Sequence, residues 1–261
     1  MTPSTGAGPA PPGQHPGFRP YQALRDELLG LPGVEWVVRC TELATSRDLR
    51  SSGGAPISFV VVDRPDGAID YEASILHHGR IACRRDASGA LHDLHNALTW
   101  LTFPLVKATF NRLHLARADR TSNGRGRLRD AVTLLDENGL LWMSRSPLLD
   151  RQLLAKDWRA LLVENRERVR EEVAPVIIGH GLLEKLAAPY KSMTAHCLIF
   201  SGGNAAAEPA GLDREVAASI AAAFDSGRPP RLAPLPILGL PGWDPANEDR
   251  SYYDDARVFR T

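Results

Sequence analysis

The sequence predicts an α+β fold, and three observations support this. Of the 261 residues, 43% are hydrophobic and 24% are charged, which is typical of a chain with a packed core. Helical and β-type segments alternate without a steady strand–helix rhythm. No GxGxxG, GxxxxGK[ST] or GxSxG motif occurs. We expect a single globular domain over residues 19–261, with mixed helices and a mostly antiparallel sheet.

Charge and cysteine content exclude several classes of protein. Lys plus Arg and Asp plus Glu each number 31, so no global field attracts nucleic acid or an anionic membrane. Any such partner must bind a local patch. The three cysteines are far apart and form no CxxC pair, which is typical of reduced thiols.

The amino-terminal segment resembles no targeting signal. The first sixteen residues contain five Pro and three Gly but no Lys or Arg, so they lack the features of a signal peptide. We expect residues 1–18 to be a disordered tail. No apolar run approaches the roughly 18 residues that span a bilayer. These features predict a cytoplasmic protein with no membrane partner.

The first half of the domain contains helical and β-type segments. A helix is expected over Tyr21–Leu29, because Gly30 and Pro32 end the pattern. Three segments rich in β-branched or aromatic residues predict strands: Val34–Cys40, Ile57–Asp63 and Ile69–Leu76. The long helical stretch Leu91–Ala118 is interrupted at Pro104, so we expect two helices.

The second half begins with an expected β-hairpin. Its strands are Ala131–Leu135 and Leu140–Ser144, and the acidic residues between them, Asp136 and Glu137, are attributed to the turn. The remaining expected elements are helices over Pro147–Val173, Gly181–Leu186 and Leu212–Phe224, and a strand over Thr194–Phe200. Pro229–Trp243 is rich in proline and is expected to form an irregular strap across the core.

The polar face of the helix at Leu91 is unusual. His92, His95, Asn96 and Thr99 share one face, and Asp93 is the only charged residue before Lys107. Uncharged hydrogen-bonding side chains in place of surface charge indicate a shielded polar stripe. The stripe is either a structural network or a site. His92 and Asp93 could also be a metal-binding pair.

Two further groups could bind anions. Lys107, Asn111 and His114 are spaced to share one helical face, which would suit a phosphate or a carboxylate, although an exposed polar face would look the same. The loop from Arg120 to Arg129 combines arginines with glycines, and includes Arg125 and Arg127. It could bind phosphate or RNA, but it lacks aromatic residues for base stacking.

The segment after Gly179 contains a second histidine pair. His180 and Glu184 are four residues apart, a spacing that suits a metal pair or an oriented base on a helix. His196 opens a predicted strand and could supply a third ligand. The alternative is that His196 is a core histidine bonded to a carbonyl group.

Long motifs in the chain resemble a bacterial family, domain-of-unknown-function family 3025. The resemblance rests on LHDLHNALTWLTFP at 91–104, RDAVTLLDENG at 129–139, GHGLLEKLAAPYKSMTAH at 179–196, and the closing LPILGLPGW and YYDDARVFR. The family offers no reaction. Its pattern includes the positions of His92, Asp93, Asn96, Lys107, His180, Glu184 and His196. The position of His95 is often aromatic, which argues against His95 as a ligand.

These observations lead to three hypotheses. The first is an enzyme, such as a metal-dependent or acid–base hydrolase acting on a phosphate-bearing or amide substrate. Its pocket would hold His92, Asp93, Asn96, His180, Glu184 and His196, with a divalent metal on His92, Asp93, His180 and His196. Substrate would be held by Lys107, Asn111, His114, Arg127 and Arg129. The second hypothesis is an RNA- or ribonucleoprotein-binding protein, and the third is a structural protein without a site.

Overall fold

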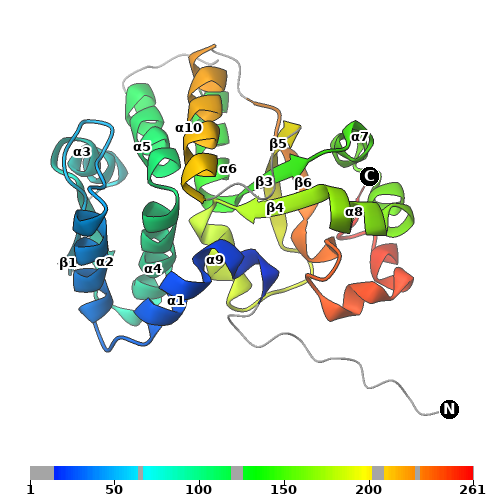
Figure 1. The fold of residues 1–261 in the computed structure, drawn as a ribbon, viewed down its shortest axis with the longest axis horizontal. Coiled ribbons are helices and arrows are strands. Elements are labelled where there is room, and N and C mark those ends of the chain that lie inside the picture. The colour runs from blue at the N-terminus through cyan, green and yellow to red at the C-terminus, as the bar shows by residue number, and fades with distance from the viewer. Residues whose placement is uncertain (1–14, 64–66, 119–125, 202–208, 227–229, 261) are drawn as a thin grey trace.

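A computed structural model describes residues 15–63, 67–118, 126–201, 209–226 and 230–260 (Figure 1). Mixed helices and strands along the chain confirm the α+β class. The α-helices are α1 (Gln22–Leu29), α2 (Glu35–Ser46), α3 (Ala68–His78), α4 (Ala87–Thr102), α5 (Pro104–Ala118), α6 (Gly126–Asn138), α7 (Pro147–Ala155), α8 (Arg166–Glu172), α9 (His180–Leu186) and α10 (Pro209–Asp225). The strands are β1 (Ser58–Val62), β2 (Arg80–Arg84), β3 (Gly139–Ser144), β4 (Val173–Ile177), β5 (Thr194–Ser201) and β6 (Ala233–Pro236).

The larger sheet has four strands in the order β4-β3-β5-β6. β3 pairs antiparallel with β4 and parallel with β5, and β5 pairs antiparallel with β6. The sheet is therefore mixed, and the prediction of a mostly antiparallel sheet is wrong. The parallel pairing arises because the chain between β3 and β5 passes through α7, α8, β4 and α9 before it returns.

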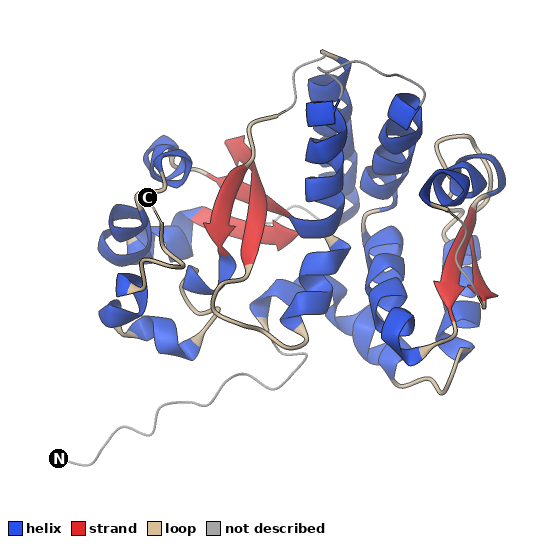
Figure 2. Cartoon of the chain, turned by 180° about the vertical axis from the view of Figure 1, so that it is seen from behind, coloured by secondary structure: helices blue, strands red, loops and turns tan. Residues whose placement is uncertain are grey.

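A second, two-stranded sheet lies on the other side of the helices. β1 and β2 are parallel, and α3 forms the crossover between them. Figure 2 shows this pair at one edge of the molecule, with the larger sheet across the central helices from it. α4 contacts both β2 and α9, and α9 in turn contacts β4. α4 and α9 therefore link the small sheet to the larger one.

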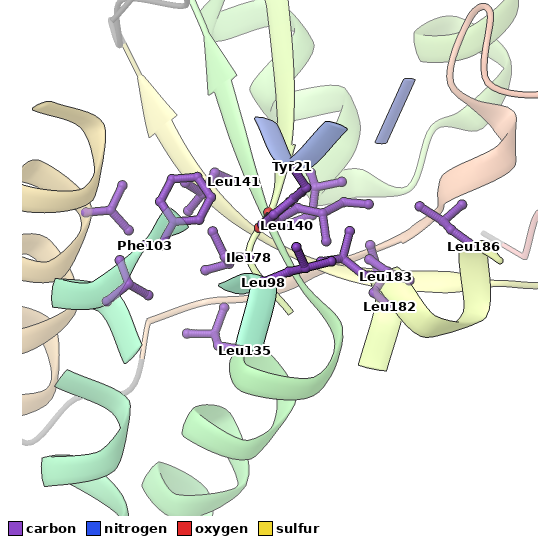
Figure 3. Close-up of a cluster of buried hydrophobic side chains, with 14 of the residues drawn as sticks. Tyr21, Leu98, Phe103, Leu135, Leu140, Leu141, Ile178, Leu182, Leu183 and Leu186 are labelled. Atoms are coloured by element: carbon purple, nitrogen blue, oxygen red, sulfur yellow. The ribbon is translucent and has the colours of Figure 1, made fainter. Parts of the chain in front are cut away.

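The core continues from the helices to the larger sheet. Figure 3 shows Leu98 of α4 and Leu135 of α6 beside Leu140 of β3 and Leu182 of α9. The fully buried Tyr21 joins this cluster, and its hydroxyl donates a 2.6 Å hydrogen bond to the Ile177 carbonyl. A buried phenol requires such a partner, so Tyr21 fixes the amino-terminal segment to β4.

Two predicted strands are helices. Val34–Cys40 lies largely in α2 and Ile69–Leu76 lies in α3, so both strand predictions are wrong. In α2 the buried residues are Trp36, Val37, Cys40, Leu43 and Ala44, which is the spacing of one helical face and not the alternation of a strand. The β-branched residues in these two segments predicted strands, although both segments are helical.

The predicted hairpin is also wrong, because its first strand belongs to α6. Asp136 and Glu137 consequently lie in the last turn of a helix and not in a β-turn. The strands predicted over Ile57–Asp63, Leu140–Ser144 and Thr194–Phe200 are confirmed as β1, β3 and β5.

The proline-rich strap contains regular structure. β6 pairs with β5 and contains Pro234 and Pro236, and β4 contains Pro175. β4 and β6 are the edge strands of the larger sheet, where proline is tolerated because one side of the strand needs no N–H donor. The prediction that the strap is irregular therefore fails over Ala233–Pro236.

Residues at the end of the predicted tail are packed. Phe18 is fully buried, and His15 Nε2 lies 2.8 Å from the Trp243 carbonyl oxygen. Predicted disorder therefore does not extend to residues 15–18, and residues 1–14 lie outside the described part. None of the helices in the described residues combines the length and apolar character needed to cross a membrane.

The break at Pro104 is confirmed, and a carboxylate from another helix completes it. Asp213 of α10 accepts hydrogen bonds of 2.9 Å from the backbone N–H groups of Leu105 and Val106 in the first turn of α5. These groups have no partner within the helix, and a negative charge is favourable at this end. Asp213 therefore caps the amino terminus of α5 from another helix, and it does so in a buried position.

We expect Asp213→Ala to lower the free energy of unfolding by about 1–3 kcal/mol, because one buried and one partly buried N–H donor lose their acceptor. Chemical denaturation measures the change. Glu215→Ala, an exposed change on the same helix, serves as the control. An equal effect of the two variants would contradict the capping role.

Candidate functional site

A cavity of about 210 Å³ lies between the small sheet and the helices beside it. Its wall is formed by β1, α3, β2, α4, α5, the end of α6 and the start of α9. Polar side chains from six of these elements line it. The cavity thus brings together helical residues as far apart in the chain as Tyr71 and His180.

Two histidines and a carboxylate meet in the cavity. The rings of His92 on α4 and His180 on α9 are 4.8 Å apart in a T-shaped arrangement. One potential ligand atom from each of His92, Glu137 and His180 lies within 4.8 Å of the others. His180 Nε2 is 3.6 Å from Glu137 Oε1. Two imidazoles and one carboxylate form a ligand set that suits a divalent metal ion.

A second carboxylate lies beside each histidine. His92 Nδ1 is 2.8 Å from Glu184 Oε2, and because an ionised carboxylate only accepts, the imidazole donates. His180 Nδ1 is 3.6 Å from Asp136 Oδ1, too long for a hydrogen bond, and this buried nitrogen has no hydrogen-bond partner among the described residues. In both rings Nδ1 faces a carboxylate, so Nε2 is the nitrogen available to a metal ion.

Asp136 also pairs with Lys107 of α5. Lys107 Nζ lies 2.5 Å from Asp136 Oδ1, and the Lys107 side chain is only 5% exposed. Burial would raise the pKa of Asp136, but Lys107 and His180 outweigh it and hold that pKa well below its usual range. Asp136 is therefore a fixed negative charge between Lys107 and His180.

Asp93 forms a salt bridge with an arginine. Arg84 of β2 donates to Asp93 from Nε at 2.9 Å, from a terminal nitrogen at 2.7 Å and from its backbone N–H at 2.7 Å. Gly89 gives this side chain room, because a Cβ there would lie 2.3 Å from Arg84 Nε. The bidentate pair positions α4 against β2 and leaves Asp93 committed to Arg84.

The α3 wall contains a buried carboxyl group. Asn111 of α5 donates from Nδ2 to the Glu72 carbonyl at 2.9 Å and to Glu72 Oε2 at 2.5 Å. Burial, with repulsion from Asp136, outweighs this bond and the charge of Lys107 and raises the pKa of Glu72 to about 7. Beside it, Asn96 donates to the Tyr71 hydroxyl at 3.0 Å.

Glycines allow α9 to approach the end of α6. A Cβ at Gly179 would lie 2.3 Å from the backbone nitrogen of Gly139, and a Cβ at Gly181 would lie 2.5 Å from Glu137 Oε2. Neither position accommodates a side chain without movement. The glycines flanking His180 therefore place its ring beside Asp136 and Glu137.

Most of the predicted site residues lie at or beside the cavity. The lining includes six of them: His92, Asp93, Asn96, Lys107, Asn111 and His180. Glu184 reaches it through His92, and His114 Nε2 lies 3.9 Å from Asp136 Oδ2. These positions agree with a common site, although their proposed roles stay predictions.

Other predicted residues lie elsewhere. His196 is on β5, opposite Gly139 and Pro234, and is not among the residues that line the cavity. Arg127 and Arg129 are in the first turn of α6, which corrects the predicted loop there, but their side chains are outside the described part. Arg120 and Arg125 also fall outside the described residues.

His95 is a core residue. Its Nδ1 lies 2.7 Å from the Leu91 carbonyl oxygen, its ring packs near Phe18, and burial lowers its pKa to about 4.

The sequence did not indicate Tyr71, Glu72 or Arg84 as site residues, and Glu137 was assigned to a turn. Two acidic residues at a helix end, where the dipole disfavours them, would have been the available signal.

Comparison with known families gives one result. A family model described as "Protein of unknown function (DUF3025)" matches residues 57–261, which is more than three quarters of the chain. The chain belongs to the DUF3025 family. The matched region begins just before β1 and contains the whole cavity, and it confirms the resemblance seen in the motifs. Neither the curated proteins nor the solved structures compared with the chain contain a match.

We expect Asp136→Asn to lower the free energy of unfolding of metal-free protein by about 3–5 kcal/mol, because Lys107 would remain buried without a counter-charge. The parent loses the contribution of Asp136 as pH falls below the ordinary carboxyl pKa of about 4, since the folded pKa is the lower one. Denaturation curves at pH 7 and at about pH 2.5 measure both effects.

Two variants control this experiment. Lys107→Met combined with Asp136→Asn removes both charges and should recover part of the loss. Glu137→Gln, a more exposed carboxylate one residue away, should cost less than about 1 kcal/mol. A double variant less stable than Asp136→Asn alone would contradict the ion-pair account.

Proposed function

We propose that the DUF3025 cavity is the active site of a metal-dependent hydrolase, with a divalent metal ion held by His92, Glu137 and His180. The observation that carries the proposal is the convergence of these three side chains, with a carboxylate at the Nδ1 side of each ring. Metal-binding histidines usually have a carboxylate, a carbonyl or water at the other ring nitrogen, which fixes the ring and its tautomer.

The ligand set favours catalysis over a purely structural metal site. Structural zinc sites are closed by four protein ligands, whereas catalytic sites use three and leave a position for water. His92, Glu137 and His180 would supply three protein ligands, and all three residues line the cavity. A metal ion bound there would lower the pKa of its water and provide a nucleophile at neutral pH.

The charges around the cavity favour an amide over a phosphate-bearing substrate. Arg84 pairs with Asp93 and Lys107 pairs with Asp136, so both cations of the lining are already neutralised. Glu137 and Glu72 add further carboxyl groups. A phosphate would therefore find no uncommitted Arg or Lys among the lining residues. RNA binding gains no support from the described residues and stays a prediction.

We expect purified protein without a histidine tag to bind one equivalent of divalent metal after incubation with Zn²⁺ and desalting. His92→Ala, Glu137→Gln and His180→Ala each remove one ligand and should weaken binding by about tenfold or more. Metal analysis and titration calorimetry measure stoichiometry and affinity. His196→Ala and the surface variant His77→Ala should bind as the parent does.

Absence of bound metal after supplementation would overturn the proposed function. So would loss of metal in His196→Ala with full retention in Glu137→Gln, because the cluster would then be elsewhere. For the reaction itself, a panel of chromogenic amides should be hydrolysed only by metal-loaded protein, and phosphate monoesters should be poorer substrates.

Glu184→Gln tests the positioning of His92. The amide can still contact Nδ1 but has no charge, so metal affinity should fall by about 10–100-fold while the ligands remain. Calorimetric titration with Zn²⁺ measures the change. Lys185→Gln, the exposed neighbour on α9, is the matched control. Unchanged affinity in Glu184→Gln would remove Glu184 from the site.

A further inference from the structure

We propose that the α3–α5 wall of the cavity, formed by Glu72 and Asn111, binds a protonated amino or guanidino group of the substrate. This inference names the substrate class of the active site proposed above and rests on that proposal. It is argued from a buried amide oxygen that the described residues leave without a donor, and from a carboxyl group that they leave without a paired cation.

Asn111 is the first such acceptor. Its side chain lines the cavity, the residue is 2% exposed, and its Oδ1 receives no hydrogen bond from any described residue. The amide orientation is fixed, because Nδ2 contacts the Glu72 carbonyl and a carbonyl oxygen can only accept. A buried amide oxygen without a donor is costly, and a ligand N–H group would remove that cost.

Glu72 is the second group. It lines the same cavity, and no ion pair joins its carboxyl group to a cation among the described residues. The nearest positive influence is Lys107, which is committed to Asp136 at 2.5 Å. Burial is the main cause of the raised pKa of Glu72, and no paired cation offsets it. A cationic ligand group beside Glu72 would neutralise its carboxylate and favour the ionised form.

The rest of the lining agrees with a cationic ligand. Asp136 repels a negative charge near Glu72, and the two cations of the cavity are each paired within 2.7 Å. An anionic group placed against this wall would meet carboxylates and an unpaired amide oxygen. A group with several N–H donors and a positive charge meets acceptors instead.

The test is calorimetric titration of full-length protein with n-butylammonium and methylguanidinium, with n-butyrate, n-butanol and inorganic phosphate as comparison ligands. It is done with chelated protein and again with Zn²⁺-loaded protein. We expect both cations to bind chelated protein at least about tenfold more tightly than the comparison ligands, and to bind in the Zn²⁺-loaded form as well, because only they offer positively charged N–H donors to Glu72 and Asn111.

Glu72→Gln keeps the shape and removes the charge, and should weaken binding of the cations by about tenfold or more. Glu35→Gln, an exposed change on α2, should have no effect. Circular dichroism verifies that each variant folds. If Glu72→Gln does not fold, the preference of the parent for n-butylammonium over n-butanol decides the question.

Three results would overturn the inference: no binding of either cation, equal or tighter binding of phosphate or n-butyrate by chelated protein, or unchanged cation affinity in folded Glu72→Gln. Metal analysis separates this from failure of the proposed function. Cation binding by chelated protein that never retains Zn²⁺ would remove the metal-dependent hydrolase and leave the cation subsite standing.

Discussion

The contact between Lys107 and Asp136 is the constraint on which the site depends. It joins α5 to the end of α6 in a buried position, where either charge alone would be strongly unfavourable. Because Asp136 also faces His180, the same carboxylate connects the packing of three helices to the orientation of a cavity imidazole. The pair therefore contributes to the geometry of the site as well as to the stability of the fold.

Close backbone approach is the second constraint. Gly179 and Gly181 bring α9 against the junction of α6 and β3, where Glu137 lies beside His180. α4 adds His92 from the opposite side and is itself held by the Arg84–Asp93 pair. The cluster is thus built where elements meet, and its residues are positioned by helices and strands whose own packing is independent of any ligand.

Sequence reasoning found the part of the site that local pattern can show. The uncharged polar face at His92 and Asn96 lies on a cavity-lining helix, and the spacing of His180 and Glu184 belongs to a helix as expected. Glu72 and Arg84 could not be found, because they acquire significance only through contacts with α5 and α4. Glu137 was attributed to a turn, because the helical spacing of α6 was read as a strand. The β1–α3–β2 unit was missed for the same reason, since β-branched residues occur in helices and strands alike.

Prolines in the edge strands have a consequence for how copies of this chain can associate. Pro234 and Pro236 have no N–H group on the outer side of β6, and Pro175 removes one from β4. A strand from another molecule would find an interrupted row of donors at both borders of the larger sheet. Continuous sheet extension between copies is disfavoured there, so self-assembly through this sheet would have to use side-chain surfaces in place of main-chain pairing.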